Sequence, residues 1–362
     1  SDIGFSIERT AEGHYLILGD GAFILNDSIY YDPVLHSLLI NESGIVLLSD
    51  TLIYLNHAVF PGWANCMNPC SDGSFVSGGS TYSQSETQRF ALWHIAANGQ
   101  MSMLGEYGPE GEEWIGRQAV ACKDGGYMIA GESSMPGVVN GMLIKTDPAG
   151  NAEWTRTYGS SAYFDFLPSV DTTADDDGFF AGGQTWEPAN KQQFWVLRVD
   201  AEGDTVWSKV WGSAYDEYYA HLTTKANGNP IVANSWAYGP MYLQMRAYMT
   251  ELDASDGSFV WQREYGSSEN TTELYTVKEV APGEGHIAVG FTYAPNSNFI
   301  QGLLLRTADN GDSLWMRSYF YYDSLMTDGL GELKDVVPTN DGGFIACGYT
   351  FGSYTGPFPQ QY

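Results

Sequence analysis

The sequence predicts an all-β protein built from a repeated four-stranded unit. Three observations support this: a glycine turn that recurs along the chain, a second element that ends in tryptophan, and the lack of any long segment with helical periodicity. The glycine turn has the form Asp-Gly-Gly-aromatic-apolar-x-x-Gly, as in KDGGYMIAG at 123–131 and NDGGFIACG at 340–348. Seven copies, at intervals of 50 to 60 residues, are anchored at Gly13, Gly73, Gly125, Gly178, Gly228, Gly285 and Gly342.

The second element lies between successive glycine turns. An apolar segment leads through an Asp-x-x-Gly turn into a segment where tryptophan follows the glycine by four positions, as Trp154 follows Gly150. The first two repeats keep this spacing with weaker residues, which is common in the terminal repeats of such arrays. A large ring in each unit is expected to pack between neighbouring units. The four tryptophans are Trp154, Trp207, Trp261 and Trp315.

Each unit therefore holds four short strands, called a to d here. In the third unit they are expected at Gln118–Cys122, Tyr127–Ala130, Met142–Thr146 and Glu153–Tyr158. Alternating apolar residues, β-branched and aromatic enrichment, and Gly and Asp punctuation all favour strands. Four antiparallel strands repeated every 50 to 60 residues are typical of a β-propeller blade. We expect one β-propeller domain over residues 1–362.

The repeats predict seven four-stranded blades, with the last blade incomplete. Seven a–b pairs are present but only six c–d pairs, and fourteen residues follow Gly348. A half blade leaves an exposed strand edge. Two alternatives are open: the polypeptide continues beyond Tyr362, which is favoured, or a partner chain completes the ring.

Composition and motifs narrow the function. With 44 acidic and 16 basic residues the formal net charge is −28, which argues against nucleic acid, because phosphate binding relies on clustered Lys and Arg. No apolar segment reaches the roughly 18 residues of a membrane-spanning helix. The six histidines show no metal-ligand spacing, and no catalytic motif is visible. No cofactor is predicted, and calcium is kept as an alternative.

Strand parity assigns the loops to two faces of the predicted ring. The short, stereotyped a–b and c–d turns share one face, and the long, variable b–c and d–a loops share the other, called the long-loop face. Aromatic rings beside carboxylates on that face could stack on and hydrogen-bond a sugar, or bind a basic partner; alternatively, they only cover the blade ends. The candidate binding residues are Trp114, Tyr163, Asp165, Trp186, Tyr218, Trp236, Tyr238 and Tyr293.

Two resemblances add to these observations. The segment LDASDGSFVW at 252–261 resembles the tryptophan-docking repeat of PQQ-dependent dehydrogenases and of PQQ-like propellers, but the adjacent cysteine pair of the enzymes is absent. The segments DGGYMIAGES and MLIKTDPAGNAEWTRTYG are similar to propeller repeats in secreted proteins of Bacteroidota, many of which are type IX secretion cargo. The second resemblance implies an extracellular or outer-surface location.

Two further patterns concern covalent chemistry. Asp-Ser/Thr-apolar triplets look like the O-glycosylation sites of exported Bacteroidota proteins. These triplets would be modified at Ser28, Thr51, Thr205, Ser313 and Ser324. Cys66 and Cys70 could bridge across a turn, or both could stay free and partly buried.

We therefore expect a non-enzymatic, secreted or surface-displayed propeller that binds a protein or a glycan through its long-loop face. One alternative is an extracellular glycan-active hydrolase or lyase on the same scaffold, with a PQQ-type oxidoreductase as a weaker one. Another is a structural subunit whose open half blade is completed by a partner. Carboxylates around a deep axial pocket would favour the enzyme, a flat aromatic surface would favour binding, and an occupied strand edge would favour assembly.

Overall fold

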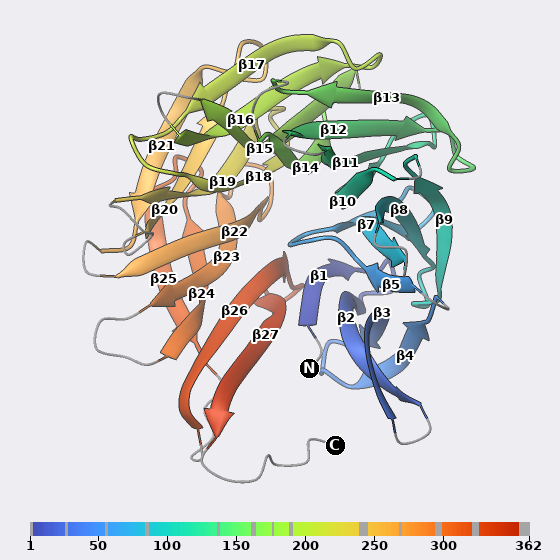
Figure 1. The fold of residues 1–362 in the computed structure, drawn as a ribbon. Coiled ribbons are helices and arrows are strands. Elements are labelled where there is room, and N and C mark those ends of the chain that lie inside the picture. The colour runs from blue at the N-terminus through green and yellow to red at the C-terminus, as the bar shows by residue number, and fades with distance from the viewer. Residues whose placement is uncertain are drawn as a thin grey trace.

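The computed structural model has an all-β propeller fold, as the repeats predict. It describes residues 3–25, 28–54, 57–83, 87–109, 111–135, 138–160, 164–175, 177–187, 191–238, 245–267, 270–293, 299–320 and 326–354. Within these residues, six four-stranded antiparallel blades surround a central axis, and one further hairpin lies between the last blade and the first (Figure 1). The inner strand of the second blade is split in two.

Each blade runs outward from the axis through strands a, b, c and d, in chain order. The first blade consists of β1 (Ile3–Arg9), β2 (Tyr15–Leu25), β3 (Ser28–Ile40) and β4 (Val46–Leu52). The second consists of β5 (His57–Phe60) with β6 (Met67–Pro69), β7 (Phe75–Ser83), β8 (Gln88–Ile95) and β9 (Met101–Tyr107). The third consists of β10 (Glu113–Ala121), β11 (Tyr127–Met135), β12 (Val138–Thr146) and β13 (Ala152–Tyr158). The fourth blade consists of β14 (Phe166–Thr172), β15 (Gly178–Glu187), β16 (Lys191–Asp200) and β17 (Thr205–Trp211). The fifth consists of β18 (Tyr218–Thr224), β19 (Pro230–Ala237), β20 (Met245–Leu252) and β21 (Phe259–Tyr265). The sixth consists of β22 (Thr271–Glu279), β23 (His286–Tyr293), β24 (Phe299–Thr307) and β25 (Ser313–Tyr319).

The recurring glycine turns join strands a and b as predicted. In the third blade the amide of Gly125 donates to the carbonyl of Cys122 at 3.0 Å, and Gly125 has a φ of 83°, which glycine adopts without strain. The two strands then pair in antiparallel register, with Ala119 opposite Ile129. Apolar side chains of the middle strands, such as Ile129 and Leu143, are fully buried between neighbouring blades.

The seventh repeat forms only a hairpin, β26 (Met326–Pro338) and β27 (Phe344–Tyr354). Strand β26 pairs in parallel with the start of β24 and contacts β22 and β1, so the hairpin closes the inner ring between the sixth blade and the first (Figure 1). The expectation of seven four-stranded blades is not supported: six are complete in the described residues. Residues 349–362 contain no Asp-x-x-Gly turn followed by tryptophan.

Aromatic side chains of strand d dock on the c–d turn of the next blade. The indole of Trp154 donates to the carbonyl of Ala201 at 3.1 Å, and the indole of Trp207 donates to that of Ala254 at 2.9 Å. Trp261 instead donates to Glu251 of its own blade at 2.8 Å, while it packs against the next blade at His286. These contacts place the repeat tryptophans between blades.

Trp315 is the exception among the four. Its ring lies 6.0 Å from that of Phe344 on β27, but no c–d turn lies beyond it in the described structure. It therefore keeps the contact with strand b of the next repeat and lacks the contact with a turn.

The predicted disulfide and the predicted O-glycosylation sites have different outcomes. All four thiols are free, so a Cys66–Cys70 disulfide is not formed. Thr51, Thr205 and Ser313 are exposed, as modification would require, whereas the side chain of Ser28 and all of Ser324 lie outside the described residues. O-glycosylation stays a prediction.

We expect Trp207→Ala to lower the free energy of unfolding by about 3 kcal/mol, because it removes a half-buried ring and one hydrogen bond between blades. Trp315→Ala is the matched control and should cost clearly less, since no turn docks against Trp315 in the described structure. Urea denaturation of both variants measures this. Equal losses at the two positions would contradict the docking role.

Candidate functional site

A β-bulge recurs in the inner strands and turns side chains toward the axis. The register shifts between Gly116 and Gln118 in β10, and the same shift occurs in β1, β14, β18, β22 and β26. A bulge inserts an unpaired residue and re-aims its side chain. The bulged segments supply Pro168, Ala220, Tyr275 and Lys334, which all contribute to the axial site.

In most blades the residue after the bulge bonds to a segment of a neighbouring blade near the axis. Gln118 donates to the carbonyl of Asn65 at 2.9 Å and accepts from the amide of Val170 at 2.9 Å. Ser169 accepts from the amide of Leu222 at 3.0 Å. Equivalent bonds are made by Ser6 to Met67, by Thr276 to Lys334, and by Asp335 to Ser6 and Ile7. Together these bonds form a polar ring around the axis.

His221 occupies this position in the fifth blade but makes no such bridge. It is 5% exposed, and neither ring nitrogen has a hydrogen-bond partner in the described structure. Burial, with a smaller effect of the Lys278 charge, lowers the pKa of His221 to about 3, so the ring is neutral at pH 7. Ser235 makes the inter-blade bond instead, accepting from the amide of Leu274 at 3.2 Å. His221 is therefore left with two unused polar atoms.

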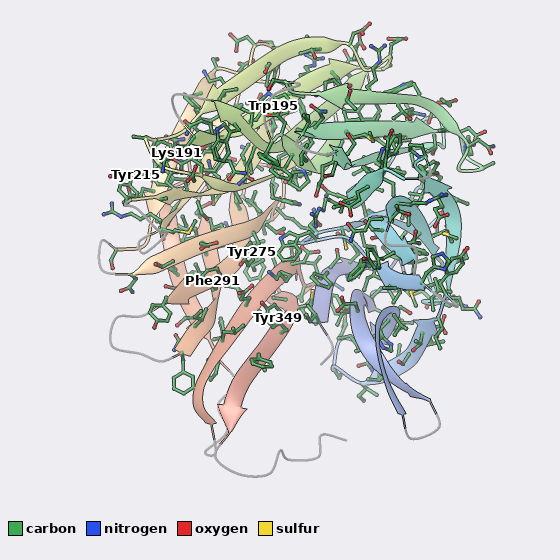
Figure 2. All side chains as sticks on the ribbon, viewed as in Figure 1. Lys191, Trp195, Tyr215, Tyr275, Phe291 and Tyr349 are labelled. Atoms are coloured by element: carbon green, nitrogen blue, oxygen red, sulfur yellow. The ribbon has the colours of Figure 1, made fainter. Side chains whose placement is uncertain are left out.

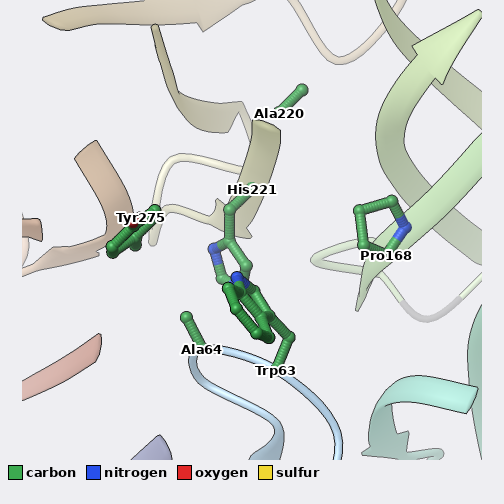
Figure 3. Close-up of a pocket in the computed structure, with 6 residues that line it drawn as sticks. All are labelled: Trp63, Ala64, Pro168, Ala220, His221 and Tyr275. Atoms are coloured by element: carbon green, nitrogen blue, oxygen red, sulfur yellow. The ribbon is translucent and has the colours of Figure 1, made fainter. Parts of the chain in front are cut away.

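The unused imidazole faces a small axial pocket. The lining residues come from four blades (Figure 3). They are Trp63, Ala64, Pro168, Ala220, His221 and Tyr275. The pocket is mostly apolar, and its lining contains no carboxylate.

Trp63 reaches the pocket because the inner strand of the second blade is interrupted. Gly62 has a φ of 109°, and a Cβ atom there would lie 2.2 Å from the carbonyl oxygen of Arg117, so the turn requires glycine. The amide of Trp63 then donates to that same carbonyl at 3.1 Å. This interruption between β5 and β6 places the indole at the axis.

A buried lysine lies behind the pocket wall. The ammonium of Lys334 is 3.8 Å from the ring centre of Tyr275 and 4.2 Å from that of Trp63, which are cation–π distances. It also pairs with Glu332 at 2.8 Å, and the Tyr275 hydroxyl donates to the same carboxylate at 3.1 Å. Burial lowers the pKa of Lys334. In Figure 2, Tyr275 lies near the centre of the ring, whereas Tyr215 lies at its periphery.

A second carboxyl lies in the same cluster. Glu273 is 8% exposed, and burial together with the charge of Glu332 raises its pKa to about 8. Glu273 is therefore largely protonated at pH 7. The axial cluster thus combines one ion pair, one protonated carboxyl and one neutral imidazole, all screened from bulk water.

A separate buried ion cluster joins the ends of the ring. Lys278 of β22 pairs with Glu8 of β1 at 2.8 Å and with Asp335 of β26 at 3.0 Å. Burial alone would lower the pKa of Lys278, but the charges of Asp335 and Glu8 keep it above its usual value. We assign this cluster to ring closure, because its partners come from the first blade, the sixth blade and the hairpin.

The long-loop face carries an aromatic cluster on the fifth blade. Trp236 stacks on Tyr248, with ring centres 4.6 Å apart. The hydroxyls of Tyr238 and Tyr248 both donate to Glu264, which also pairs with Arg246. The Arg246 guanidinium lies over the Tyr238 ring at 4.2 Å, and Tyr238 is 37% exposed. We call Trp236, Tyr238, Tyr248, Arg246 and Glu264 the blade-five cluster.

Two other predicted binding residues have different environments. Trp186 is half-buried and packs edge-on against Phe164 at 6.4 Å. Asp165 is fully buried, and its carboxylate accepts bonds from Thr185 and from the amides of Ser160 and Trp186. Its predicted binding role is therefore corrected to a structural one, because a carboxylate that is fully buried and bonded on both oxygens is not available to a ligand.

The remaining predicted residues are dispersed around the long-loop face. Trp114 donates to Glu112 at 3.0 Å and packs against Phe90, and Tyr293 is exposed. Tyr163 and the side chain of Tyr218 lie outside the described residues. The structure thus brings Trp236 and Tyr238 together and leaves Trp114 and Tyr293 on other blades.

Sequence reasoning did not identify Trp63, His221, Tyr275 or Lys334. A signal existed for Trp63, because the 60-residue interval from Gly13 to Gly73 is the longest and holds the interruption between β5 and β6. No comparable signal marks the bulges.

The described residues hold neither a metal-ligand cluster nor a membrane-spanning helix. No group of three or more His, Cys, Asp or Glu side chains there could hold a metal ion. No helix in that part of the chain has the length and apolarity needed to cross a membrane. Calcium binding stays an untested alternative.

Comparison with known proteins identifies the fold and no family. No family model and no curated protein sequence matches this chain. A protein of unknown function from Dyadobacter fermentans has 12% identity and a TM-score of 0.53, over 87% of this chain and 93% of its own. The periplasmic gluconolactonase PpgL of Pseudomonas aeruginosa has 12% identity and a TM-score of 0.54, over 87% and 85%. Sqt1 of Chaetomium thermophilum has 12% identity and a TM-score of 0.52, over 96% and 93%.

These neighbours are β-propeller proteins, one of them from the Bacteroidota, and at such identities they show the fold alone. None of the comparisons supports the resemblance to type IX secretion cargo or to PQQ-like propellers.

We expect Glu273→Gln to change how stability depends on pH. The carboxyl ionises near pH 4.5 in the unfolded chain but near pH 8 in the folded one, so the parent loses stability as the pH rises between these values. The variant should match the parent at pH 5 and exceed its free energy of unfolding by on the order of 2 kcal/mol at pH 8. Denaturation curves at both pH values measure this; a constant difference would contradict the raised pKa.

Proposed function

We propose that this chain is a non-enzymatic, extracellular or surface-displayed binding module that holds an uncharged oligosaccharide on its long-loop face. The observation that carries the proposal is the blade-five cluster. It presents an exposed tyrosine beside a carboxylate and a guanidinium. Aromatic rings pack against the apolar faces of sugar rings, and flanking charged groups hydrogen-bond the hydroxyls.

Charge selects the class of glycan. At a net charge of −28 the chain repels anionic polysaccharides at long range, so sulfated or uronic-acid chains are disfavoured. An uncharged oligosaccharide meets no such barrier. The secreted location rests on the sequence resemblance to exported Bacteroidota propellers.

The enzyme alternative has weaker support. A glycosidase needs two carboxyl groups about 5 to 10 Å apart that both face the substrate. The axial pocket has no carboxylate in its lining, and the nearby Glu332 is engaged by Lys334 and Tyr275. The exposed Tyr238 beside Arg246 and Glu264 therefore supports ligand binding better than the axial pocket supports catalysis.

We expect Tyr238→Ala to weaken binding by about 2 kcal/mol, or roughly thirtyfold, as for an aromatic anchor. The ligand is the uncharged oligosaccharide that the parent chain binds most tightly. Trp236→Ala should have a similar effect. A glycan array identifies the ligand, and titration calorimetry measures the loss.

Asp200→Asn is the control variant. Asp200 holds a c–d turn on the opposite face by accepting from the amides of Glu202 and Asp204. Its replacement should lower stability and leave affinity unchanged. Affinity lost at Asp200 but kept at Tyr238 would show that the ligand binds the other face.

A further inference from the structure

The outer edge of β27 lacks the strand that covers its counterparts. In each complete blade, strand b pairs with a and with c, whereas β27 pairs only with β26 in the described structure. Ile345 and Ala346 are accordingly half-buried, while the equivalent Ile287 and Ala288 of β23 are fully buried. A half-exposed apolar strand edge is a template for another strand.

The third blade shows what normally fills the adjacent space. Its outer strand reaches the c–d turn of the fourth blade through three side chains. The indole of Trp154 donates to the Ala201 carbonyl at 3.1 Å, and the Tyr158 hydroxyl donates to the Gly203 carbonyl at 2.7 Å. Between them, Arg156 pairs at 2.7 Å with the aspartate that follows that glycine.

The sixth blade has the same three residue types without their partners. Trp315, Arg317 and Tyr319 occupy the three positions on β25. Their backbones pair with β24, but among the described residues none of their side chains makes a hydrogen bond or an ion pair, and Arg317 lies over the Trp315 ring at 5.0 Å. Tyr319 is 50% exposed, whereas the equivalent Tyr265, which docks on the next turn, is 6% exposed.

The space between the sixth blade and the first, beside β27, is called the gap here. On its far side, the c–d turn of the first blade lacks a preceding strand d in the described structure. The turn glycine of a blade normally lies against strand d of the preceding one. A Cβ atom added at Gly99 would meet Leu48 at 3.1 Å, and one at Gly311 would meet Trp261 at 2.5 Å. At Gly44 of the first blade nothing lies within 4 Å. Among the described residues, nothing therefore fills the gap beside β27, β25 or the first blade.

We propose that this gap is an acceptor site for a β-hairpin of a partner polypeptide, with an acidic Asp-x-x-Gly-Asp turn. One strand of the hairpin pairs with β27. The turn offers carbonyls to Trp315 and Tyr319 and a carboxylate to Arg317, and a large apolar side chain of the second strand covers Gly44. Addition of strands to a sheet edge is a common mode of peptide recognition, and here it continues the interface already present between the other blades.

The probe is a fluorescent peptide with the sequence of residues 194–212, the c–d hairpin of the fourth blade. Its turn already makes all three contacts with the third blade. We expect the 362-residue chain to bind it saturably in fluorescence anisotropy, and the β27 amides to become protected from hydrogen exchange. Because an isolated hairpin is only marginally stable, a second form links the peptide to the chain through a flexible linker and measures the melting temperature, which should rise.

A charge exchange locates the site. Arg317→Glu should weaken binding at least tenfold, and a peptide with Asp204→Lys should restore it to within about threefold. Arg317 is exposed, so its replacement leaves the fold intact. Arg156→Glu is the matched control, because Arg156 already has its aspartate partner in the chain, and it should leave peptide affinity unchanged.

Three results would overturn the proposal. The first is no binding together with no rise in the melting temperature of the linked form. The second is binding that Arg317→Glu does not weaken. The third is a dimer of the chain in sedimentation that Arg317→Glu dissociates, since a second copy would then occupy the gap. None of these results bears on the glycan site, which lies on another blade and is measured separately.

Discussion

The propeller depends on polar side chains that join neighbouring inner strands around the axis. Each follows a β-bulge, and each reaches backbone or side-chain atoms of the next strand, as Gln118 and Ser169 do. Buried polar groups are favourable only when they are bonded, and here each bond satisfies an atom on two blades at once. Lys278 and Asp335 complete this ring where the hairpin meets the first blade. Hydrogen bonds and ion pairs thus hold the inner strands together at the axis, while apolar side chains pack between the blades.

The same bulges that complete this ring also create the axial site. A bulged residue cannot continue the alternation of its strand, so Tyr275 and Lys334 turn to the axis while Thr276 and Asp335 form the bridges. Burial then determines the chemistry of the cluster: it lowers the pKa of Lys334 and raises that of Glu273. Both groups are buried, so each is held closer to its neutral form than it would be in water.

The sequence predicts the features that recur in every repeat. It does not predict features that depend on the environment of a single residue. The glycine turns and the docking of Trp154 and Trp207 follow from spacing, because each turn needs glycine and each blade interface needs a large ring. The burial of Asp165 could not be predicted from its loop position. Glu217 has a related environment, with bonds from the Ser213 and Ala237 amides and a pKa raised by burial to about 7. A carboxylate shortly after strand d in two consecutive blades was a repeat signal, and it indicates structure.

The hairpin β26–β27 connects the two regions in which the ring departs from regularity. Its inner strand supplies Lys334 and Glu332 to the axial cluster, and its outer strand carries the uncovered edge. Ring closure does not need that edge, because Asp335 bonds to the first blade from the inner strand. The fold can therefore persist with the gap empty. Lys334 lies on β26, whose partner β27 has an uncovered outer edge in the described structure. A strand added to β27 would therefore lie one strand away from the element that carries Lys334.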